Sequence, residues 1–186
     1  MSLNKTKINS SVYYLATVSL GVAFTVVASW ISIPFLVNFS LQTMVIFIIS
    51  ALLGFRKSMI SVLIYIFLGI IGLPVFSGFG AGIGVVSGPH GGFILGFLFI
   101  PPLVSLFTAK TKNLISYIFA MLISVIPCYV LGTLWYGCIF ADSSSVWSIL
   151  MICIVPFLFP ELVKVLLAAV IVCRLKKIQS KFNQTP

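Results

Sequence analysis

The chain has 186 residues, of which 61% are hydrophobic and 7% are charged, and its mean hydropathy is +1.26. This composition excludes a soluble domain and indicates a membrane protein with several spans. The hydrophilic ends, residues 1–11 and 176–186, are each too short to bury a core, so we expect one membrane domain over residues 1–186. The net charge of +9 requires no nucleic-acid partner, because membrane orientation and attraction to anionic lipid headgroups account for basic residues beside apolar runs.

Charged residues, prolines and glycines divide the apolar sequence into six predicted transmembrane helices in an all-α fold. Their approximate ranges are 12–33, 40–55, 58–73, 91–109, 113–133 and 156–175. The first has the length of a full span and no small-residue cleavage site, so we expect it to be retained and not removed as a signal peptide. The second and third are short and closely connected at residues 54–57, which predicts a helical hairpin. Residues 143–155 predict a lid-like or interfacial helix before the last span.

The basic residues predict the orientation of these helices. With both termini in the cytoplasm, every basic residue except Lys164 falls on the cytoplasmic side, whereas the outer connections near 34–39, 74–90 and 135–145 contain no lysine or arginine. The basic residues on the cytoplasmic side are Lys5, Lys7, Arg56, Lys57, Lys110, Lys112, Arg174, Lys176, Lys177 and Lys181. An odd number of spans would place the two basic ends on opposite sides and break this pattern.

The first predicted helix carries small residues at spacings that allow close helix approach, namely Thr17, Ser19, Gly21 and Ala23. They could pack inside the bundle or face a partner protein.

The outer connection between the third and fourth helices is rich in glycine. Residues 69–96 hold ten of the fourteen glycines together with several large apolar side chains. Irregular backbone at membrane depth is tolerated where it is buried in protein or lines a cavity. This segment therefore predicts a loop that caps a ligand pocket, the alternative being a flexible outer loop.

The last predicted helix contains Glu161 and Lys164, three residues apart in an apolar run. Only one other acidic residue, Asp142, occurs in the chain. Residues at i and i+3 share a helix face, and charges within a membrane usually pair and mark a ligand or ion path. We expect Glu161 near the first turn, where the helix dipole favours an anion. The pair predicts a ligand site, the alternative being an ion pair that only fixes helix packing.

Metal, disulfide and nucleotide chemistry find little support in the sequence. The four cysteines are scattered, without a Cys-x-x-Cys pair, and His90 is the one histidine, so we expect no metal site and no cofactor. A nucleotide-binding P-loop requires a Gly-Lys pair, and no glycine here precedes a lysine. If transport is driven by ATP, separate subunits must supply it.

Four segments, in order along the chain, resemble the biotin transporter family BioY. They are LQT at 41–43, GIIGLPVFSG at 69–78, GPHGGFILGF at 88–97 and PELVK at 160–164. The resemblance implies a six-helix, biotin-binding S component of an energy-coupling factor transporter in the cytoplasmic membrane of a prokaryote. It further implies that the chain associates with a transmembrane T component and ATPase subunits, docking through the small residues of the first helix.

The resemblance implies that Glu161 and Lys164 contact the polar ends of biotin and that the loop 76–92 closes over the ligand. The expected ligand-binding residues are Gln42, Phe79, Gly80, His90, Phe93, Glu161 and Lys164. Three positions depart from the family pattern, which commonly has aspartate at 161 and often has threonine at 90 and tyrosine at 93.

Three alternatives remain open at this point. The chain could be an S component for another small vitamin, or a solitary carrier that couples transport to protons through Glu161. It could also be an intramembrane hydrolase with Ser77 or Ser87 as nucleophile and His90 as base. The hydrolase is disfavoured because the sequence offers no carboxylate near the loop to orient the histidine, so we expect no enzymatic activity.

Overall fold

The computed structural model describes residues 2–33, 39–109, 113–140 and 146–182, and within these ranges it is a bundle of helices with one short antiparallel ladder. The helices are α1 (Ser2–Trp30), α2 (Gln42–Leu53), α3 (Phe55–Ile70), η1 (Ser77–Phe79), α4 (Ile83–Ser87), α5 (Gly91–Gly96), η2 (Phe97–Phe99), α6 (Ile100–Thr108), α7 (Leu114–Ile139), α8 (Val146–Cys153) and α9 (Val155–Phe182). Strands β1 (Ser32–Ile33) and β2 (Phe39–Ser40) pair with Ser32 opposite Ser40. Predictions that concern 34–38, 110–112 and 141–145, including the positions of Lys110, Lys112 and Asp142, lie outside the described residues.

Four helical stretches among the described residues are long and apolar enough to cross a membrane. They are Ser10–Trp30, Gly91–Thr108, Leu114–Ile139 and Trp147–Lys181, and they correspond to four of the six predicted spans. The predicted hairpin is present as α2 and α3, which meet at Gly54 with a φ of 77°. These two helices have 12 and 16 residues, or about 18 and 24 Å at 1.5 Å per residue, shorter than a hydrocarbon core of about 30 Å.

Helix α7 ends later than predicted, and α9 begins close to its predicted start. Helix α7 continues to Ile139, beyond the predicted end near 133, and includes Pro127. The short helix expected before the last span is α8, and α9 begins directly after it at Val155, next to Pro156. Proline suits the first turn of a helix, because its missing N–H would be unpaired there in any case.

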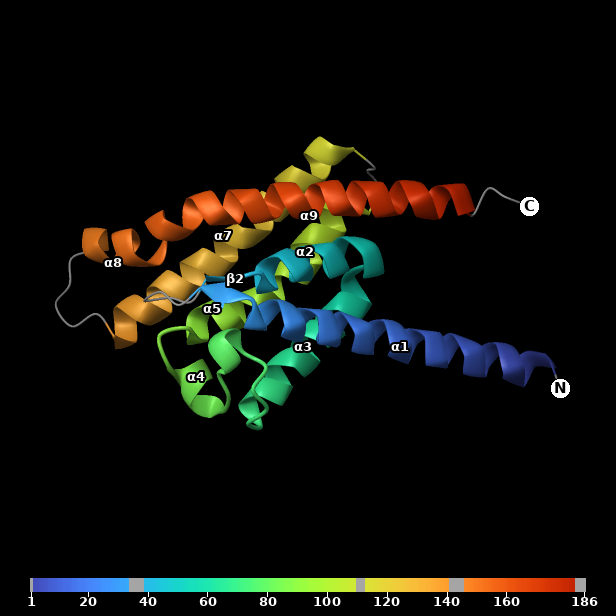
Figure 1. Cartoon of the computed structure of the whole chain (residues 1–186), viewed down its shortest axis with the longest axis horizontal. Helices are drawn as coiled ribbons and strands as arrows, with labels where there is room; N and C mark the ends of the chain where they lie inside the picture. Colours follow the sequence, from blue (N-terminus) through green and yellow to red (C-terminus); the bar gives the residue numbers. More distant parts are fainter. Residues whose placement is uncertain (1, 34–38, 110–112, 141–145, 183–186) are drawn as a thin grey trace.

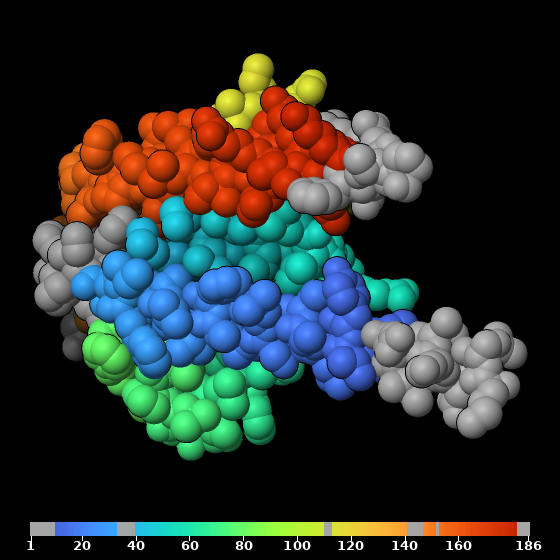
Figure 2. Space-filling view, turned by 45° about the vertical axis from the view of Figure 1, so that its right-hand side comes forward, coloured from blue at the N-terminus to red at the C-terminus, as the bar shows by residue number. Residues whose placement is uncertain are grey.

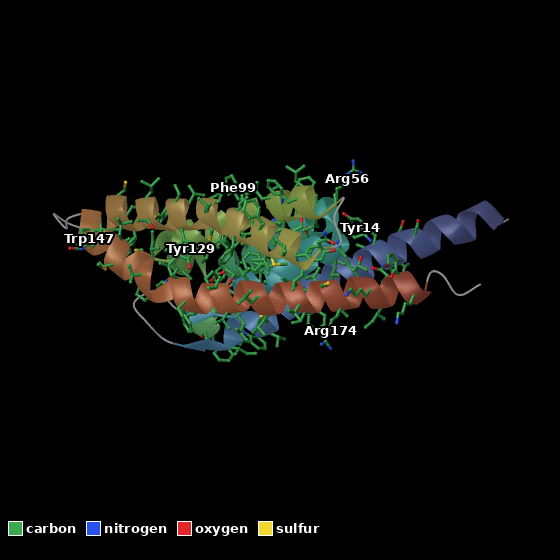
Figure 3. The ribbon with its side chains drawn as sticks, turned by 90° about the horizontal axis from the view of Figure 1, so that it is seen from above. Tyr14, Arg56, Phe99, Tyr129, Trp147 and Arg174 are labelled. Atoms are coloured by element: carbon green, nitrogen blue, oxygen red, sulfur yellow. The ribbon has the colours of Figure 1, made fainter. Side chains whose placement is uncertain are left out.

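The bundle is organised around α2, which packs against α1, α6 and α9 (Figure 1). Figure 2 shows α1, α2 and α9 side by side on one face of the molecule. Both described chain ends leave the same end of the bundle in Figure 1, and the labelled Arg56 and Arg174 lie toward that end in Figure 3, with Trp147 at the other. The core includes Phe47, Tyr65, Ile100, Met121 and Val165.

Several glycines of the predicted capping loop belong instead to the contact between α5 and α7. A Cβ on Gly92 would lie 2.4 Å from the Trp135 Cβ, and a Cβ on Gly96 would lie 2.6 Å from the Cys128 Cα. Small residues four apart let two helix backbones approach closely. The indole N–H of Trp135 donates to the Gly88 carbonyl at 3.0 Å, which fixes the chain just before α5. This contact places α5 beside the cavity described next.

Candidate functional site

A cavity of about 380 Å³ lies between the start of α2, the segment 76–90, and helices α5, α7 and α9. Its volume falls within the range of about 300–1,000 Å³ that small-molecule sites occupy. Most of its wall is apolar, and a few polar side chains project into it. The polar residues that line it are Ser40, Gln42, Thr43, Ser77, His90, Cys128, Tyr129, Glu161 and Lys164.

Glu161 and Lys164 form a buried ion pair in this wall, as the sequence predicted for helical spacing. The two residues are 6% and 4% exposed. The Lys164 ammonium also donates to Thr43 Oγ1 at 2.7 Å and to the Ser40 carbonyl at 3.3 Å. A buried charge is tolerated when it is paired and hydrogen-bonded, and the ammonium meets this condition with three oxygen partners.

The prediction that Glu161 lies in the first turn of its helix, where the helix dipole would stabilise the carboxylate, is wrong. Because α9 begins at Val155, Glu161 lies in its second turn and not in the first. The dipole effect falls off within the first turn of a helix. The carboxylate is therefore held mainly by Lys164, and not by the end of the helix.

Two polar atoms in the same part of the wall have no hydrogen-bond partner in the described parts of the chain. They are Glu161 Oε1 and Gln42 Nε2. The other amide atom of Gln42, its Oε1, accepts a long hydrogen bond from Ser40 Oγ at 3.5 Å. Buried polar atoms are almost always paired in folded proteins, so an unpaired acceptor and an unpaired donor beside a cavity indicate a ligand group that pairs with both.

Six of the seven predicted ligand-binding residues line the cavity, namely Gln42, Gly80, His90, Phe93, Glu161 and Lys164. The exception is Phe79, whose side chain is 62% exposed and stacks on Trp30 with ring centroids 5.4 Å apart. The structure therefore does not support a direct ligand contact for Phe79.

His90 precedes α5 and is half-buried at the edge of the cavity. Burial lowers the pKa of its imidazole below the usual value, because removal from water disfavours the charged form. The side chain is therefore neutral at neutral pH.

The site also contains residues that the sequence analysis did not select. Thr43 bonds Lys164, and Tyr129, labelled in Figure 3, packs edge-on against Phe93 with ring centroids 6.1 Å apart. Thr43 follows Gln42 at the start of a largely apolar helix, and two adjacent polar residues there were a usable signal. The sequence offered no comparable signal for Tyr129, because an aromatic residue in an apolar helix is usually part of the core.

The two serines considered as nucleophiles lie in different places. Ser77 lines the cavity, whereas Ser87, at the end of α4, is exposed and outside it. The buried carboxylate in the cavity is Glu161, which is paired with Lys164. Because this carboxylate is engaged by Lys164 and Ser87 lies outside the cavity, the arrangement does not favour a hydrolase.

The four small residues predicted for partner docking differ in burial. Gly21 is buried against α3, where a Cβ would lie 2.7 Å from Ser61 Oγ, so its small size serves packing inside the bundle. Thr17 is half-buried and donates to the Tyr13 carbonyl of its own helix at 2.9 Å. Ser19 and Ala23 are exposed. Docking through this helix stays a prediction.

The chain is similar to known proteins over most of its length. The model of the BioY family matches residues 3–181 of the chain. Biotin transporter BioY2 of Lactococcus lactis subsp. cremoris is 35% identical over 166 residues, which cover 87% of this chain and 89% of that protein. Biotin transporter BioY of Thermotoga maritima is 34% identical over 158 residues, covering 84% of this chain and 92% of that protein.

A solved structure also resembles this one. It is the crystal structure at 2.1 Å of the S component for biotin from an ECF-type ABC transporter. The match has a TM-score of 0.83 and 29% sequence identity, and it covers 91% of this chain and 93% of the other. The likeness therefore extends over nearly the whole chain.

Proposed function

The chain belongs to the BioY family, and on this premise we propose that it takes up biotin as the S component of an energy-coupling factor transporter. In this role it selects the vitamin, and separate ATPase subunits acting through a T component supply the energy. The observation that carries the proposal from the structure is the largely apolar cavity with the Glu161–Lys164 pair in its wall. The activity is transport and not catalysis, in keeping with relatives that are named as transporters.

The unpaired atoms of the cavity suggest how biotin lies in it. Biotin carries a cyclic urea, with N–H donors beside a carbonyl acceptor, and a carboxylate on an aliphatic tail. Within the described parts of the chain, Glu161 Oε1 is an acceptor and Gln42 Nε2 a donor that make no hydrogen bond. In the proposed complex, Glu161 Oε1 accepts a hydrogen bond from a urea N–H of biotin. The Gln42 side-chain amide donates a hydrogen bond to the urea carbonyl. Lys164 orients Glu161 and supplies positive charge to the site.

We further propose that all 186 residues form one membrane domain with six spans, in which α2 and α3 cross as a short hairpin and both termini are cytoplasmic. Arg56 and Arg174, which lie toward the end of the bundle from which both termini leave, support this orientation (Figure 3). The glycine-rich segment 76–90 then lies at the outer surface and caps the cavity that it lines. The membrane is the cytoplasmic membrane of a prokaryote, and surrounding lipid and the T component are partners of the bundle.

Cys138 gives a direct test of this orientation, because it is exposed near the end of α7, whereas Cys128 and Cys153 are buried. A thiol reagent that cannot cross membranes is expected to label Cys138 in intact cells, and a Cys138→Ser variant is expected to lose that label. Labelling of Cys138 only after the membrane is opened would reverse the proposed orientation.

Uptake of labelled biotin tests the proposed function. Cells that lack their own biotin transporter are supplied with this chain alone, with the T component and ATPases alone, or with all of them. We expect ATP-dependent accumulation with the complete set, suppressed by excess unlabelled biotin and not by riboflavin. Accumulation that depends on the proton gradient and not on the ATPases would support a solitary carrier instead, and competition by another vitamin would reassign the ligand.

A further inference from the structure

The turn η1 has an unusual backbone in the part of the chain that the structure describes. Gly78 and Phe79 follow one another with φ values of 68° and 61°, in the left-handed region. Phe79 is the one non-glycine residue with positive φ among the described residues. Such conformations are costly for residues with a Cβ and persist where the surroundings hold them, frequently at ligand clamps.

Contacts from α1 and β1 hold this turn in place. The Phe79 ring stacks on Trp30, the last residue of α1, with an interplanar angle of 25°. The indole N–H of Trp30 donates to the Pro74 carbonyl at 2.8 Å. The backbone N–H of Gly78 donates to Ser32 Oγ at 3.1 Å. The turn is thus held at Gly78 and at Phe79 by groups from outside its own segment.

The side chain that this turn presents to the cavity is Ser77. It lines the cavity, and its hydroxyl oxygen is buried without a hydrogen-bond partner among the residues that the structure covers. A buried hydroxyl without a partner costs free energy that an alanine would not cost. Together with the strained backbone and its external supports, this cost indicates that the hydroxyl has a partner when the cavity is occupied.

We propose that the Ser77 hydroxyl hydrogen-bonds the bound ligand, and that the stack of Phe79 on Trp30 is the positioning device that directs this hydroxyl into the cavity. The inference rests on the proposed function, because its ligand is biotin. It adds a contact from the capping segment to those that Glu161 and Gln42 provide from α9 and α2. It also gives Phe79 a role that does not require its ring to touch the ligand.

Binding of biotin to the purified chain tests the contact. Ser77→Ala is expected to weaken binding roughly fivefold, the loss typical of one hydrogen bond, and to leave the melting temperature of the unliganded protein unchanged or higher. Ser87→Ala is the matched control, since Ser87 lies in the same glycine-rich segment but outside the cavity, and it should stay within about twofold of the wild type. Equal affinity of the wild type and Ser77→Ala for biotin would overturn the contact.

Substitutions of Trp30 test the positioning role. Trp30→Ala is expected to weaken biotin binding about as much as Ser77→Ala, and Trp30→Phe to restore much of it because a ring remains to stack on Phe79. If the stack acts through Ser77, the variant with both alanines binds no more weakly than Ser77→Ala alone. Fully additive losses would show that Trp30 acts on the ligand by another route and would overturn this role.

Hydrogen exchange of the unliganded protein separates this inference from the proposed function. The amide of Gly78 is expected to be protected in the wild type and to exchange faster in Trp30→Ala. Unchanged exchange would contradict the positioning role even if biotin binds. A wild type that binds no biotin would overturn the proposed function and with it the ligand contact of Ser77, whereas faster exchange in Trp30→Ala would still support the positioning of the turn.

Discussion

Replacing Glu161 by glutamine separates a structural role of the ion pair from a role in binding. The change keeps the shape of the side chain but leaves the ammonium of Lys164, which is 4% exposed, without its carboxylate. Breaking a buried pair in this way costs about 3–5 kcal/mol. Because Thr43 and the Ser40 carbonyl still accept from the ammonium, we expect the lower end, about 3 kcal/mol, or on the order of a hundredfold in the ratio of folded to unfolded protein.

The double variant Glu161→Gln/Lys164→Met provides the decisive comparison. Replacing a whole buried pair by uncharged residues of similar volume is often neutral or stabilising. Unfolding in mixed detergent micelles should therefore show the double variant closer in stability to the wild type than Glu161→Gln alone. Calorimetric titration with biotin should nevertheless show a loss of affinity of about a hundredfold, because charged hydrogen-bonding groups of the site are gone. A stable double variant that binds biotin as the wild type does would refute a binding role for the pair.

Three further predictions concern the surroundings of the pair. Gly96→Ala should lower the free energy of unfolding by about 1–3 kcal/mol, because its Cβ would meet the α7 backbone. Gly84→Ala should change it by less than about 0.5 kcal/mol, because no atom of the described residues lies within 4 Å of the added Cβ; denaturant titration of both variants checks this. Thr43→Val removes the hydroxyl that accepts a hydrogen bond from Lys164 and should weaken biotin binding about tenfold. Thr43→Ser is the control, because it keeps that hydroxyl. Equal affinities of Thr43→Val and Thr43→Ser for biotin would contradict the argument. Burial lowers the pKa of His90 in the folded protein. The stability that the neutral imidazole provides is therefore complete above the usual histidine pKa of about 6.5 and is lost as the pH falls through the lower folded value. The melting temperature should fall less between pH 8 and pH 5 in His90→Gln than in the wild type, and parallel pH profiles of the two proteins would contradict this.

The site was predictable where charge had to be explained within an apolar sequence. Glu161 and Lys164 stand out because a membrane offers them no solvent, so they must pair or face a cavity, and they do both. The hairpin at Gly54 was predictable because a charged, glycine-containing connection interrupts two apolar runs.

Other features of the site depend on contacts between helices that cannot be predicted from individual residues. The glycines at 92 and 96 suggested a flexible or capping loop, but they allow α5 to approach α7, which depends on which helices become neighbours. Ser77 and Phe79 were both noted, yet their roles depend on a turn whose backbone is fixed by Trp30, some fifty residues away in sequence. Contacts of this range follow from the tertiary fold and not from local propensity.

Equilibrium binding of biotin to the purified full chain in detergent tests the central claim most directly, with riboflavin as the control ligand and the Glu161→Gln/Lys164→Met variant as the control protein. We predict saturable binding of one biotin per chain, no binding of riboflavin, and an affinity for biotin that is about a hundredfold lower in the variant. A folded, monodisperse wild-type protein that binds no biotin would contradict the account.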